Sequence, residues 1–342
     1  MRGVVFLGDR RLEVREVPDP RPGPRQVIVE IKASGMCGSD LPPYRAAPDT
    51  VLPIVRGHEP CGVVSELGSA VGEDEARIGQ RVMVHHYSGC GRCKHCRVGY
   101  TQMCLDAHLV YGATANGGHT SHMLVQPSML VPLSDELTFE AGAAISCGTG
   151  TAYLALKRLA VSGRETLAIF GQGPVGLSAT LLAKAMGARV IAIDLAPERL
   201  QLARALGADE TIQAGSLDPV ALIQDLTHGE GAPTALDCTG SSEGRLNAVK
   251  CAASWGRVCF VGEGGSATFE VSPQIIHKQL TIYGSWTFSA VGQAECAQFV
   301  VDHQLSLEPL LTHRFSLDQA EEAYRLVDTQ TTGKGVFVRS ER

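Results

Sequence analysis

Six short runs of mainly β-branched and other apolar residues alternate with helix-length segments after about Ser162. This alternation is typical of βαβ units, in which each crossover carries the chain back so that the strands lie parallel. The crossovers 174–188 and 197–208 begin with a proline and end near a glycine, which suits the two ends of a helix. The weaker crossovers 218–229 and 241–254 are long enough for helices as well. The predicted strands of this six-stranded doubly wound parallel sheet are 165–170, 189–194, 209–213, 233–237, 257–261 and 280–284.

The turn after the first predicted strand reads Gly171-Gln172-Gly173-Pro174-Val175-Gly176. Glycines at this spacing let the backbone turn tightly and let a pyrophosphate approach the N-terminus of the following helix. Asp194 ends the second predicted strand, where a carboxylate can accept hydrogen bonds from an adenosine ribose. Because Asp194 would repel a 2′-phosphate, the sequence favours NAD over NADP, although Arg199 could approach the same ribose.

The part of the chain before Cys147 has a different pattern. Runs such as VIVEIKASG and CGVVSELG are broken by Gly and Pro and show almost no helical periodicity. They predict the short strands of an all-β unit. A chain of 342 residues is too long for one ordinary core, so two domains are expected.

Four of the eleven cysteines lie close together, with C-x2-C-x2-C-x7-C spacing. One loop can thereby deliver four thiolates, from Cys90, Cys93, Cys96 and Cys104, to a tetrahedral zinc ion. Four sulfurs leave no open coordination position, so this zinc would brace the loop and take no part in chemistry. The alternatives are disulfides, which a reducing compartment disfavours, and an iron–sulfur cluster, whose motif the run matches only loosely.

A second set of possible ligands is dispersed along the chain. It comprises Cys37 in CGSD, His58 and Glu59 in GHE, and Cys147 in ISCGTGTAY. Taken singly each is weak evidence, because a lone cysteine is more often a small buried apolar residue. Their meaning comes from the order in which they occur.

With CGSD, RGHEPCG, the four-cysteine loop, SCGTGTAY and GQGPVG in that order, the chain resembles the zinc-containing alcohol dehydrogenase branch of the medium-chain dehydrogenase/reductase superfamily. The resemblance covers nearly the whole chain. It implies an α/β protein in which a GroES-like β-barrel catalytic domain is joined to a Rossmann coenzyme domain. The implied limits are 1–148 for the GroES-like domain with both zinc sites, 149–287 for the NAD-binding domain, and 288–342 for a segment that returns to complete the catalytic domain.

The resemblance implies that Cys37, His58 and Cys147 hold a catalytic zinc ion, with one position open for water or substrate oxygen. Glu59 would be a carboxylate that visits the metal during ligand exchange. The cofactors are thus NAD and two zinc ions per chain, one catalytic and one structural. Zinc would polarise the hydroxyl of the substrate, from which hydride passes to the nicotinamide.

The remaining site residues are also implied by the resemblance. Asp40 would orient His58 and fix its tautomer, and Ser39 would take the proton of the alcohol. The further cofactor contacts would be Thr151 beside the nicotinamide, Val261 at the carboxamide and Lys334 at the pyrophosphate.

One position departs from the family pattern. Many relatives carry a histidine three residues after the serine of CGSD to pass the proton outward, and here Pro42 stands there. Proline cannot carry a proton. The hypothesis is that the proton leaves through the ribose hydroxyls to water, or by way of Tyr44.

Other conspicuous residues have no partner at a ligand spacing. His85, His86 and His95 are expected to be structural or exposed. Trp286 could line the coenzyme and substrate cleft, or could equally belong to the core or an interface. The cysteines expected to pack in apolar surroundings are Cys61, Cys238, Cys251, Cys259 and Cys296.

Charge and hydropathy limit the partners. A formal net charge of −6 with scattered Lys and Arg leaves no basic face for nucleic acid. No run approaches the roughly eighteen apolar residues of a membrane span, and the first residues turn charged too early for a secretory signal. We therefore expect a cytoplasmic protein without a membrane or nucleic acid partner. Its substrate would be a small alcohol or carbonyl compound, and the resemblance suggests a homo-oligomer, with a tetramer favoured.

The predicted function is hydride transfer between NAD and a primary alcohol, a secondary alcohol or a polyol. One alternative is an aldehyde or ketone reductase that uses NADPH. The other is a dinucleotide-binding homologue that has lost its chemistry. Metal content separates the last from the enzymes, because loss of function in this superfamily usually removes a zinc ligand.

Overall fold

The computed structural model describes residues 1–106 and 109–339, and the chain divides into two compact units. Unit 1 comprises Met1–Gly150, Phe288–Gln330 and the chain from Lys334 onward, and unit 2 comprises Thr151–Thr287 and Thr331–Gly333. Within the described residues, no helix is both long and apolar enough to cross a membrane.

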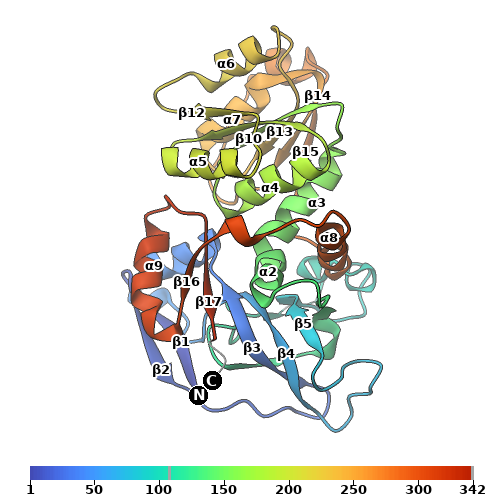
Figure 1. Cartoon of the computed structure of the whole chain (residues 1–342), viewed down its shortest axis with the longest axis vertical. Helices are drawn as coiled ribbons and strands as arrows, with labels where there is room; N and C mark the ends of the chain where they lie inside the picture. The colour runs from blue at the N-terminus through green and yellow to red at the C-terminus, as the bar shows by residue number, and fades with distance from the viewer. Residues whose placement is uncertain (107–108, 340–342) are drawn as a thin grey trace. The chain divides into compact units, whose positions relative to one another are not determined.

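Unit 2 is built on a six-stranded sheet in the order β12-β11-β10-β13-β14-β15, in which every pair of neighbours is parallel (Figure 1). All six predicted strands are confirmed. The order reverses between β10 and β13, and in such sheets ligands bind outside the carboxyl ends of the strands at this point. The strands are β10 (Thr166–Phe170), β11 (Arg189–Asp194), β12 (Glu210–Gln213), β13 (Ala232–Asp237), β14 (Ala252–Phe260) and β15 (Thr281–Gly284).

The helices of unit 2 follow the predicted crossovers. α4 and α5 both begin at a proline, and each is followed by a glycine of positive φ, Gly187 at +88° and Gly207 at +98°. These glycines end the helices in the left-handed conformation that side chains disfavour. A π-helical turn at Ser272–Ile276 precedes β15. The α-helices are α3 (Gly150–Leu159), α4 (Pro174–Ala185), α5 (Pro197–Ala205), α6 (Pro219–Leu226) and α7 (Ser242–Cys251).

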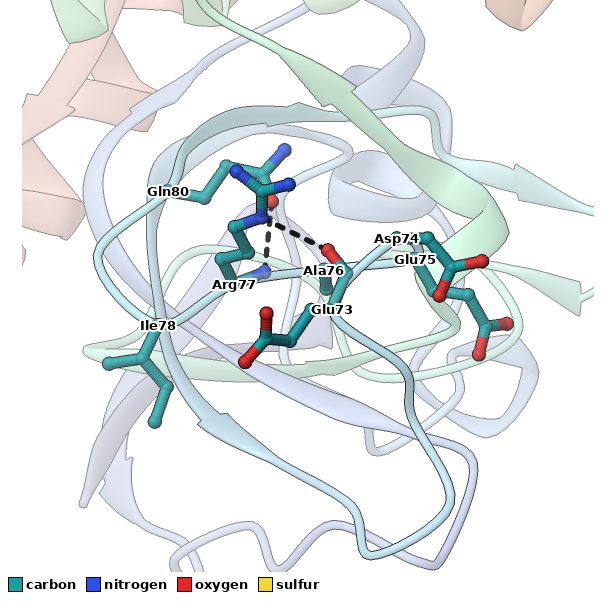
Figure 2. A pocket seen from close by; sticks show the side chains of 7 residues that line it. All are labelled: Glu73, Asp74, Glu75, Ala76, Arg77, Ile78 and Gln80. Atoms are coloured by element: carbon teal, nitrogen blue, oxygen red, sulfur yellow. Dashed lines mark hydrogen bonds between the residues drawn. The ribbon is translucent and has the colours of Figure 1, made fainter.

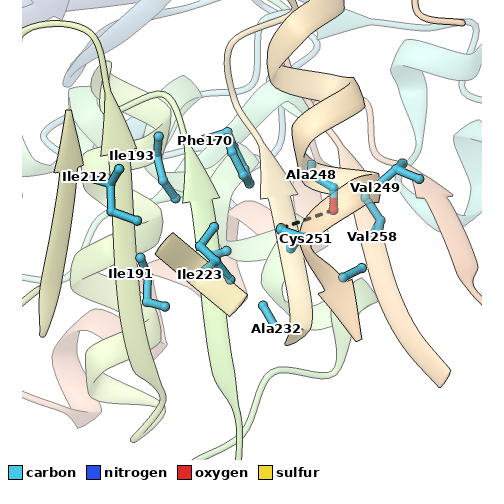
Figure 3. Packing of buried hydrophobic residues seen from close by; sticks show 13 residues of the cluster. Phe170, Ile191, Ile193, Ile212, Ile223, Ala232, Ala248, Val249, Cys251 and Val258 are labelled. Carbon is cyan, nitrogen blue, oxygen red and sulfur yellow. Dashed lines mark hydrogen bonds between the residues drawn. The ribbon is translucent and has the colours of Figure 1, made fainter. Parts of the chain in front are cut away.

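Apolar side chains fill the space between this sheet and its helices. Figure 3 shows Phe170, Ile191 and Ile193 on the strands, with Ile223 of α6 packed among them. All four are at most 2% exposed. Parallel strands covered by helices must be apolar on both faces, which explains their continuous apolar sequence.

Unit 1 is organised around a seven-stranded sheet in the order β16-β17-β3-β4-β5-β9, with β8 also paired to β3. β17, near the end of the described chain, lies antiparallel beside β3, as Figure 1 shows. The strands of this sheet are β3 (Val27–Gly35), β4 (Glu59–Leu67), β5 (Arg81–Val84), β8 (His122–Val125), β9 (Leu130–Pro132), β16 (Leu311–Phe315) and β17 (Lys334–Val338). Two smaller sheets pair β1 (Arg2–Gly8) with β2 (Arg11–Glu16), and β6 (Tyr87–Ser88) with β7 (Leu109–Val110).

Unit 1 also contains helices, so the expectation of an all-β unit before Cys147 was incomplete. A continuous helical segment runs from α2 through a π-helical turn, Ile145–Thr149, into α3. α2 is rich in alanine and glycine and packs against β3 and β4. The sequence around α2 has the periodicity of strands, so α2 was not predicted. The α-helices are α1 (Leu41–Arg45), α2 (Phe139–Ala144), α8 (Ala290–Asp302) and α9 (Ala320–Asp328), and the 3-10 turns are Gly38–Asp40, Pro48–Thr50, Cys96–Val98, Thr101–Met103, Pro127–Met129, Glu308–Leu310 and Leu317–Gln319.

An aromatic cluster joins distant parts of unit 1. Phe6 of β1, Tyr44 of α1, Tyr324 of α9 and Phe337 of β17 all belong to one buried core. The rings of Phe6 and Tyr324 meet edge to face, with centroids 4.8 Å apart. Residues after 288 are therefore part of the same core as the first strand.

The acidic loop before β5 forms a shallow hollow on unit 1 (Figure 2). Arg77 closes the loop, because its Nε donates to the Glu73 carbonyl at 3.1 Å and its N–H donates to Gln80 Oε1 at 3.1 Å. Asp74 and Glu75 are exposed. These exposed carboxylates do not point toward one common position, so they do not form a binding site. The hollow is a surface turn.

Candidate active site

The dispersed ligand set converges in unit 1. One ligand atom from each of Cys37, His58, Glu59 and Cys147 lies within 4.8 Å of all the others. The Sγ atoms of Cys37 and Cys147 are 3.9 Å apart, much farther than the roughly 2.0 Å of a disulfide. Two sulfurs bound at about 2.3 Å to one tetrahedral zinc ion lie about 3.8 Å apart, so this pair fits a shared zinc ion.

Three different elements deliver these ligands. Cys37 precedes the turn Gly38–Asp40, Glu59 begins β4, and Cys147 lies in the π-helical turn. The hydrogen bond with Cys147, together with the neighbouring His58, holds the pKa of the Cys37 thiol well below its usual range. A thiol with a depressed pKa is readily available as thiolate, the form that binds metal.

Asp40 contacts His58, the residue that the family resemblance implies it orients. His58 Nδ1 lies 3.1 Å from Asp40 Oδ1, and the Cys37 N–H donates to Oδ2 at 2.9 Å. Burial opposes ionisation of the carboxyl, but His58 and these hydrogen bonds lower the pKa of Asp40 to about 2. An ionised Asp40 holds the proton on Nδ1 and leaves Nε2 for a metal. Ser39 Oγ lies on that side, 3.3 Å from Nε2.

Glu59 forms a buried ion pair with Lys334. The side chains of the two residues are 0% and 3% exposed. Glu59 Oε1 has no hydrogen-bond partner within the described chain. Burial raises the pKa of the Glu59 carboxyl to about 8, against the opposing charge of Lys334. An orphaned buried carboxylate oxygen beside two thiols and an imidazole is suited to a cation.

Lys334 is placed differently from the sequence expectation. Its ammonium pairs with Glu59 and donates to the Met36 carbonyl at 3.2 Å within unit 1. A lysine this deeply buried needs such partners, because an unpaired charge in the interior is costly. Its contact with a pyrophosphate stays a prediction.

Sequence reasoning missed the role of the paired histidines after β5. The His86 ring packs edge to face on His58, with centroids 5.1 Å apart, and is 3% exposed. His85 Nδ1 lies 3.2 Å from Gln293 Oε1, and Gln293 donates to Ser146 Oγ beside Cys147. Burial lowers the pKa of His85 to about 4, so it adds no charge at neutral pH. Neither histidine is exposed, and no ligand spacing could have revealed their positions.

Tyr44 is enclosed, which contradicts its proposed role as an outlet for the proton. The residue is 3% exposed, and its ring lies 5.4 Å from that of Phe6 and 5.5 Å from that of Tyr324. A side chain surrounded by aromatic rings gives a proton no contact with water. Pro42, in contrast, is exposed.

The four-cysteine loop forms a second convergent group. The Sγ atoms of Cys90, Cys93, Cys96 and Cys104 all lie within 4.8 Å of one another, and the side chains are half-buried. Backbone N–H groups point at the sulfurs, from Cys90 to Cys104 at 3.3 Å and from Cys93 to Cys90 at 3.4 Å. Backbone hydrogen bonds lower the pKa of Cys93 to about 6. Four thiols that accept hydrogen bonds from the backbone in this way are suited to a tetrahedral metal ion with no open coordination position. His95 lies in the loop outside this ligand group.

The glycine turn of unit 2 has the backbone that the motif requires. Gly171 has φ +89°, and a Cβ there would lie 2.8 Å from Thr239. A Cβ on Gly176 would lie 1.8 Å from the Gly171 carbonyl oxygen. Only glycine fits either position. Gly173 caps α4, and Pro174 is its first residue, with Val175 next, so free N–H groups at this helix start face the turn.

Asp194 and Arg199 flank this turn. Asp194 accepts from the Gln172 N–H at 2.5 Å and from the Ala196 N–H at 2.8 Å, which fixes its carboxylate at the end of β11. The Arg199 guanidinium lies 3.8 Å from the Cβ position of Gly173, and its Nε donates to the Thr332 carbonyl at 3.1 Å. An anion at the start of α4 would therefore meet a cation.

The remaining predicted residues lie at the edges of elements of unit 2. Thr151 is buried in α3, Val261 follows β14 with its N–H donating to the Asp237 carbonyl, and Trp286 is 44% exposed after β15. Cys238 is half-buried. The other cysteines outside the two ligand groups, Cys61, Cys251, Cys259 and Cys296, are fully buried.

Comparison with known proteins agrees with this geometry. Residues 23–135 match the alcohol dehydrogenase GroES-like domain, and residues 174–303 match the zinc-binding dehydrogenase family. An uncharacterized zinc-type alcohol dehydrogenase-like protein of Escherichia coli is 42% identical over 98% of both chains. L-idonate 5-dehydrogenase of Vitis vinifera is 34% identical, over 93% of this chain and 89% of the relative. The alcohol dehydrogenase TADH of Thermus sp. ATN1 has a similar structure, with a TM-score of 0.90, 30% identity and 99% coverage of both chains.

A GroES-like domain, a Rossmann-like domain and two convergent ligand groups define a zinc-type oxidoreductase. The chain belongs to the zinc-containing alcohol dehydrogenase family of medium-chain dehydrogenases.

Proposed function

We propose that this protein transfers hydride between an alcohol and NAD, with zinc held by Cys37, His58 and Cys147. The proposal is carried by the convergence of these three side chains and Glu59 within 4.8 Å. Zinc bound there would supply Lewis acidity toward an oxygen of the substrate. Three protein ligands leave room for that oxygen, with Glu59 available during exchange.

The chain's own residues set the proton chemistry in this proposal. Asp40 would retain the Nδ1 proton of His58, which leaves Nε2 free to bind the metal. Ser39 Oγ lies 3.3 Å from His58 Nε2 and is the proposed acceptor of the proton of the substrate hydroxyl. With Tyr44 enclosed, the proposed outlet is the ribose of the coenzyme.

NAD is the proposed coenzyme because the Asp194 carboxylate at the end of β11 would repel a 2′-phosphate on the adenosine ribose. Gly171, Gly173 and Gly176 would admit the pyrophosphate to the start of α4, which Arg199 also faces. Thr151 and Val261 are the proposed contacts of the nicotinamide.

A reductase that uses NADPH is the second candidate. One observation favours it, namely the Arg199 guanidinium 3.8 Å from the Cβ position of Gly173. The coenzyme test is a comparison of NAD and NADP in wild type and in Asp194→Ala. We expect NAD to be preferred in wild type and the preference to weaken in the variant.

A secondary hydroxyl is the proposed reacting group, since the similar Vitis vinifera protein is a 5-dehydrogenase of L-idonate. The test is a panel of primary alcohols, secondary alcohols and polyols, followed as NADH absorbance. Metal content is measured alongside. The proposal requires two zinc ions per chain, of which one leaves with a chelator together with activity. One zinc per chain with no turnover would favour a non-catalytic homologue.

We also propose that the protein is a homo-oligomer, most simply a tetramer, that uses the edge of the unit 2 sheet. β15 ends that sheet, and a terminal strand presents backbone groups without partners to another chain. Ile282 on β15 is 37% exposed, and Trp255, on the neighbouring strand β14, is 76% exposed. Sedimentation of Ile282→Glu against wild type tests this surface, with a smaller particle expected for the variant.

A further inference from the structure

A line of hydrogen bonds leaves the candidate metal site from the far oxygen of Asp40. Asp40 Oδ2 accepts from the Tyr324 hydroxyl at 3.4 Å. The Tyr324 oxygen lies 2.8 Å from His119 Nε2, and His119 Nδ1 lies 2.8 Å from Ser34 Oγ. Tyr324, His119 and Ser34 are at most 1% exposed. These residues have no part in the chemistry described so far.

Donation from Tyr324 to Asp40 sets the direction of the other protons in this line. An ionised Asp40 can only accept, so the Tyr324 proton points to Asp40. The Tyr324 oxygen then accepts from His119 Nε2–H, and His119 Nδ1, without a proton, accepts from Ser34. Burial lowers the pKa of His119 to about 4, which agrees with a neutral ring.

Packing holds the rings in place. A Cβ on Gly57 would lie 2.3 Å from His119 Nδ1, so the imidazole lies directly against the backbone that precedes His58. Gly57 has φ +95°, a second reason for glycine here. The His119 ring also meets Phe337 edge to face, with centroids 4.7 Å apart. Neither His119 nor Tyr324 can turn without displacing these neighbours.

We propose that Tyr324 and His119 are positioning residues that hold the Asp40 carboxylate so that His58 keeps one tautomer and one orientation toward the catalytic metal. The inference rests on the proposed function, because it takes His58 as a metal ligand. The line ends at Ser34, which is buried, so it gives no proton a path to solvent. Its effect is on how firmly His58 holds the ion.

The test is the rate at which zinc passes from the holoenzyme to a chelating dye. For Tyr324→Phe we expect release from the dispersed site about 10-fold faster, the lower end of what outer partners of a metal-bound histidine contribute. The ion of the four-cysteine loop is an internal reference whose release should not change. Cys93→Ala, which removes that ion, identifies the two phases.

His119→Phe keeps a flat ring against Gly57 and removes both nitrogens. We expect a smaller acceleration than in Tyr324→Phe, and none beyond it in the double variant, because His119 acts through Tyr324. In an Asp40→Asn background, Tyr324→Phe should have no further effect. Additive effects in either comparison would overturn the proposal.

Tyr111→Phe is the matched control. Tyr111 is another buried tyrosine of unit 1, and its hydroxyl accepts from the Gln126 N–H at 3.0 Å without any link to Asp40. Loss of the Tyr111 hydroxyl should lower the melting temperature and leave the rate of zinc release unchanged. The visible spectrum of cobalt bound at the dispersed site gives a second readout, expected to change in Tyr324→Phe only. If Tyr324→Phe matches Tyr111→Phe in both readouts, the positioning role is wrong. If wild type holds no ion at the dispersed site, the proposed function itself fails.

Discussion

The four cysteines of the Cys90–Cys104 loop come from a segment in which the first and last ligands are 14 positions apart. Cys37 and Cys147, in contrast, are 110 positions apart, and their surroundings include Lys334 from the far end of the described chain. The first group depends on local turns and backbone N–H groups, and the second depends on packing across all of unit 1. A change in that packing should therefore damage only one of the two groups.

The largest expected difference is in turnover. Cys147→Ser removes a ligand of the dispersed group, and we expect kcat/KM to fall by roughly 10³-fold or more, since Lewis acidity is worth several kcal/mol. The zinc content should drop from two ions to one per chain. Cys296→Ser replaces a fully buried thiol outside both groups and should keep both ions. Retained turnover in Cys147→Ser would show that this cysteine is no ligand.

The opposite pattern is expected for the loop. Cys93→Ala should lower the free energy of unfolding by about 4 kcal/mol, since loss of a structural metal is among the few large effects of single substitutions. Thermal unfolding measures this loss. The folded fraction should retain turnover within about tenfold of wild type, because a closed four-thiolate ion takes no part in chemistry. Complete inactivation without loss of stability would contradict the separation of the two groups.

Lys334→Met tests the dependence of the dispersed group on distant packing. It removes the partner of the buried Glu59, whose pKa of about 8 already favours the neutral carboxyl, and we expect unfolding to become easier by about 2 kcal/mol. The control is Lys184→Met, which breaks a partly exposed pair with Asp209 and should cost at most about 1 kcal/mol. Denaturant unfolding compares the two. A second change, Glu59→Gln, should recover part of the loss, whereas zinc in the loop should be unaffected by either substitution.

The effect that is smallest at neutral pH, and that grows only on acidification, is on stability. The pKa of buried His119 is about 4, below the ordinary 6.5, so the unfolded chain binds a proton there first as the pH falls. Stability from a neutral His119 is complete above pH 6.5 and declines toward pH 4, by up to about 1.4 kcal/mol per pH unit. The free energy of unfolding of His119→Phe should have a shallower pH slope across this window. Equal slopes would mean that His119 is not held neutral in the folded protein.

The four-cysteine group and the dispersed group also differ in how far the sequence could predict them. All six strands of unit 2 and its crossover helices follow from local patterns, and the loop at Cys90–Cys104 follows from spacing alone. Cys37, His58 and Cys147 could be grouped only through a family resemblance, because nothing local links them.

The partners of the dispersed group lay outside the reach of sequence reasoning. His119 and Tyr324 are 205 positions apart, and His85 and Gln293 are 208 apart. A single polar residue in an apolar context gives no spacing to interpret, and its partner is chosen by tertiary packing. The enclosure of Tyr44 was missed for the same reason, since Phe6 and Tyr324 surround it from opposite ends of the unit.

The π-helical turn at Ile145–Thr149 makes Cys147 sensitive to chain length. A wide turn holds one residue more than an α-helical turn does, and such turns are frequent at functional sites. Deleting one residue there would restore regular winding and rotate the neighbouring side chains by about 100° around the helix axis. Cys147 would then turn away from Cys37 while every ligand type remained in the sequence. Homologues that have lost one position here should therefore lack zinc at this site, even when they keep the cysteine.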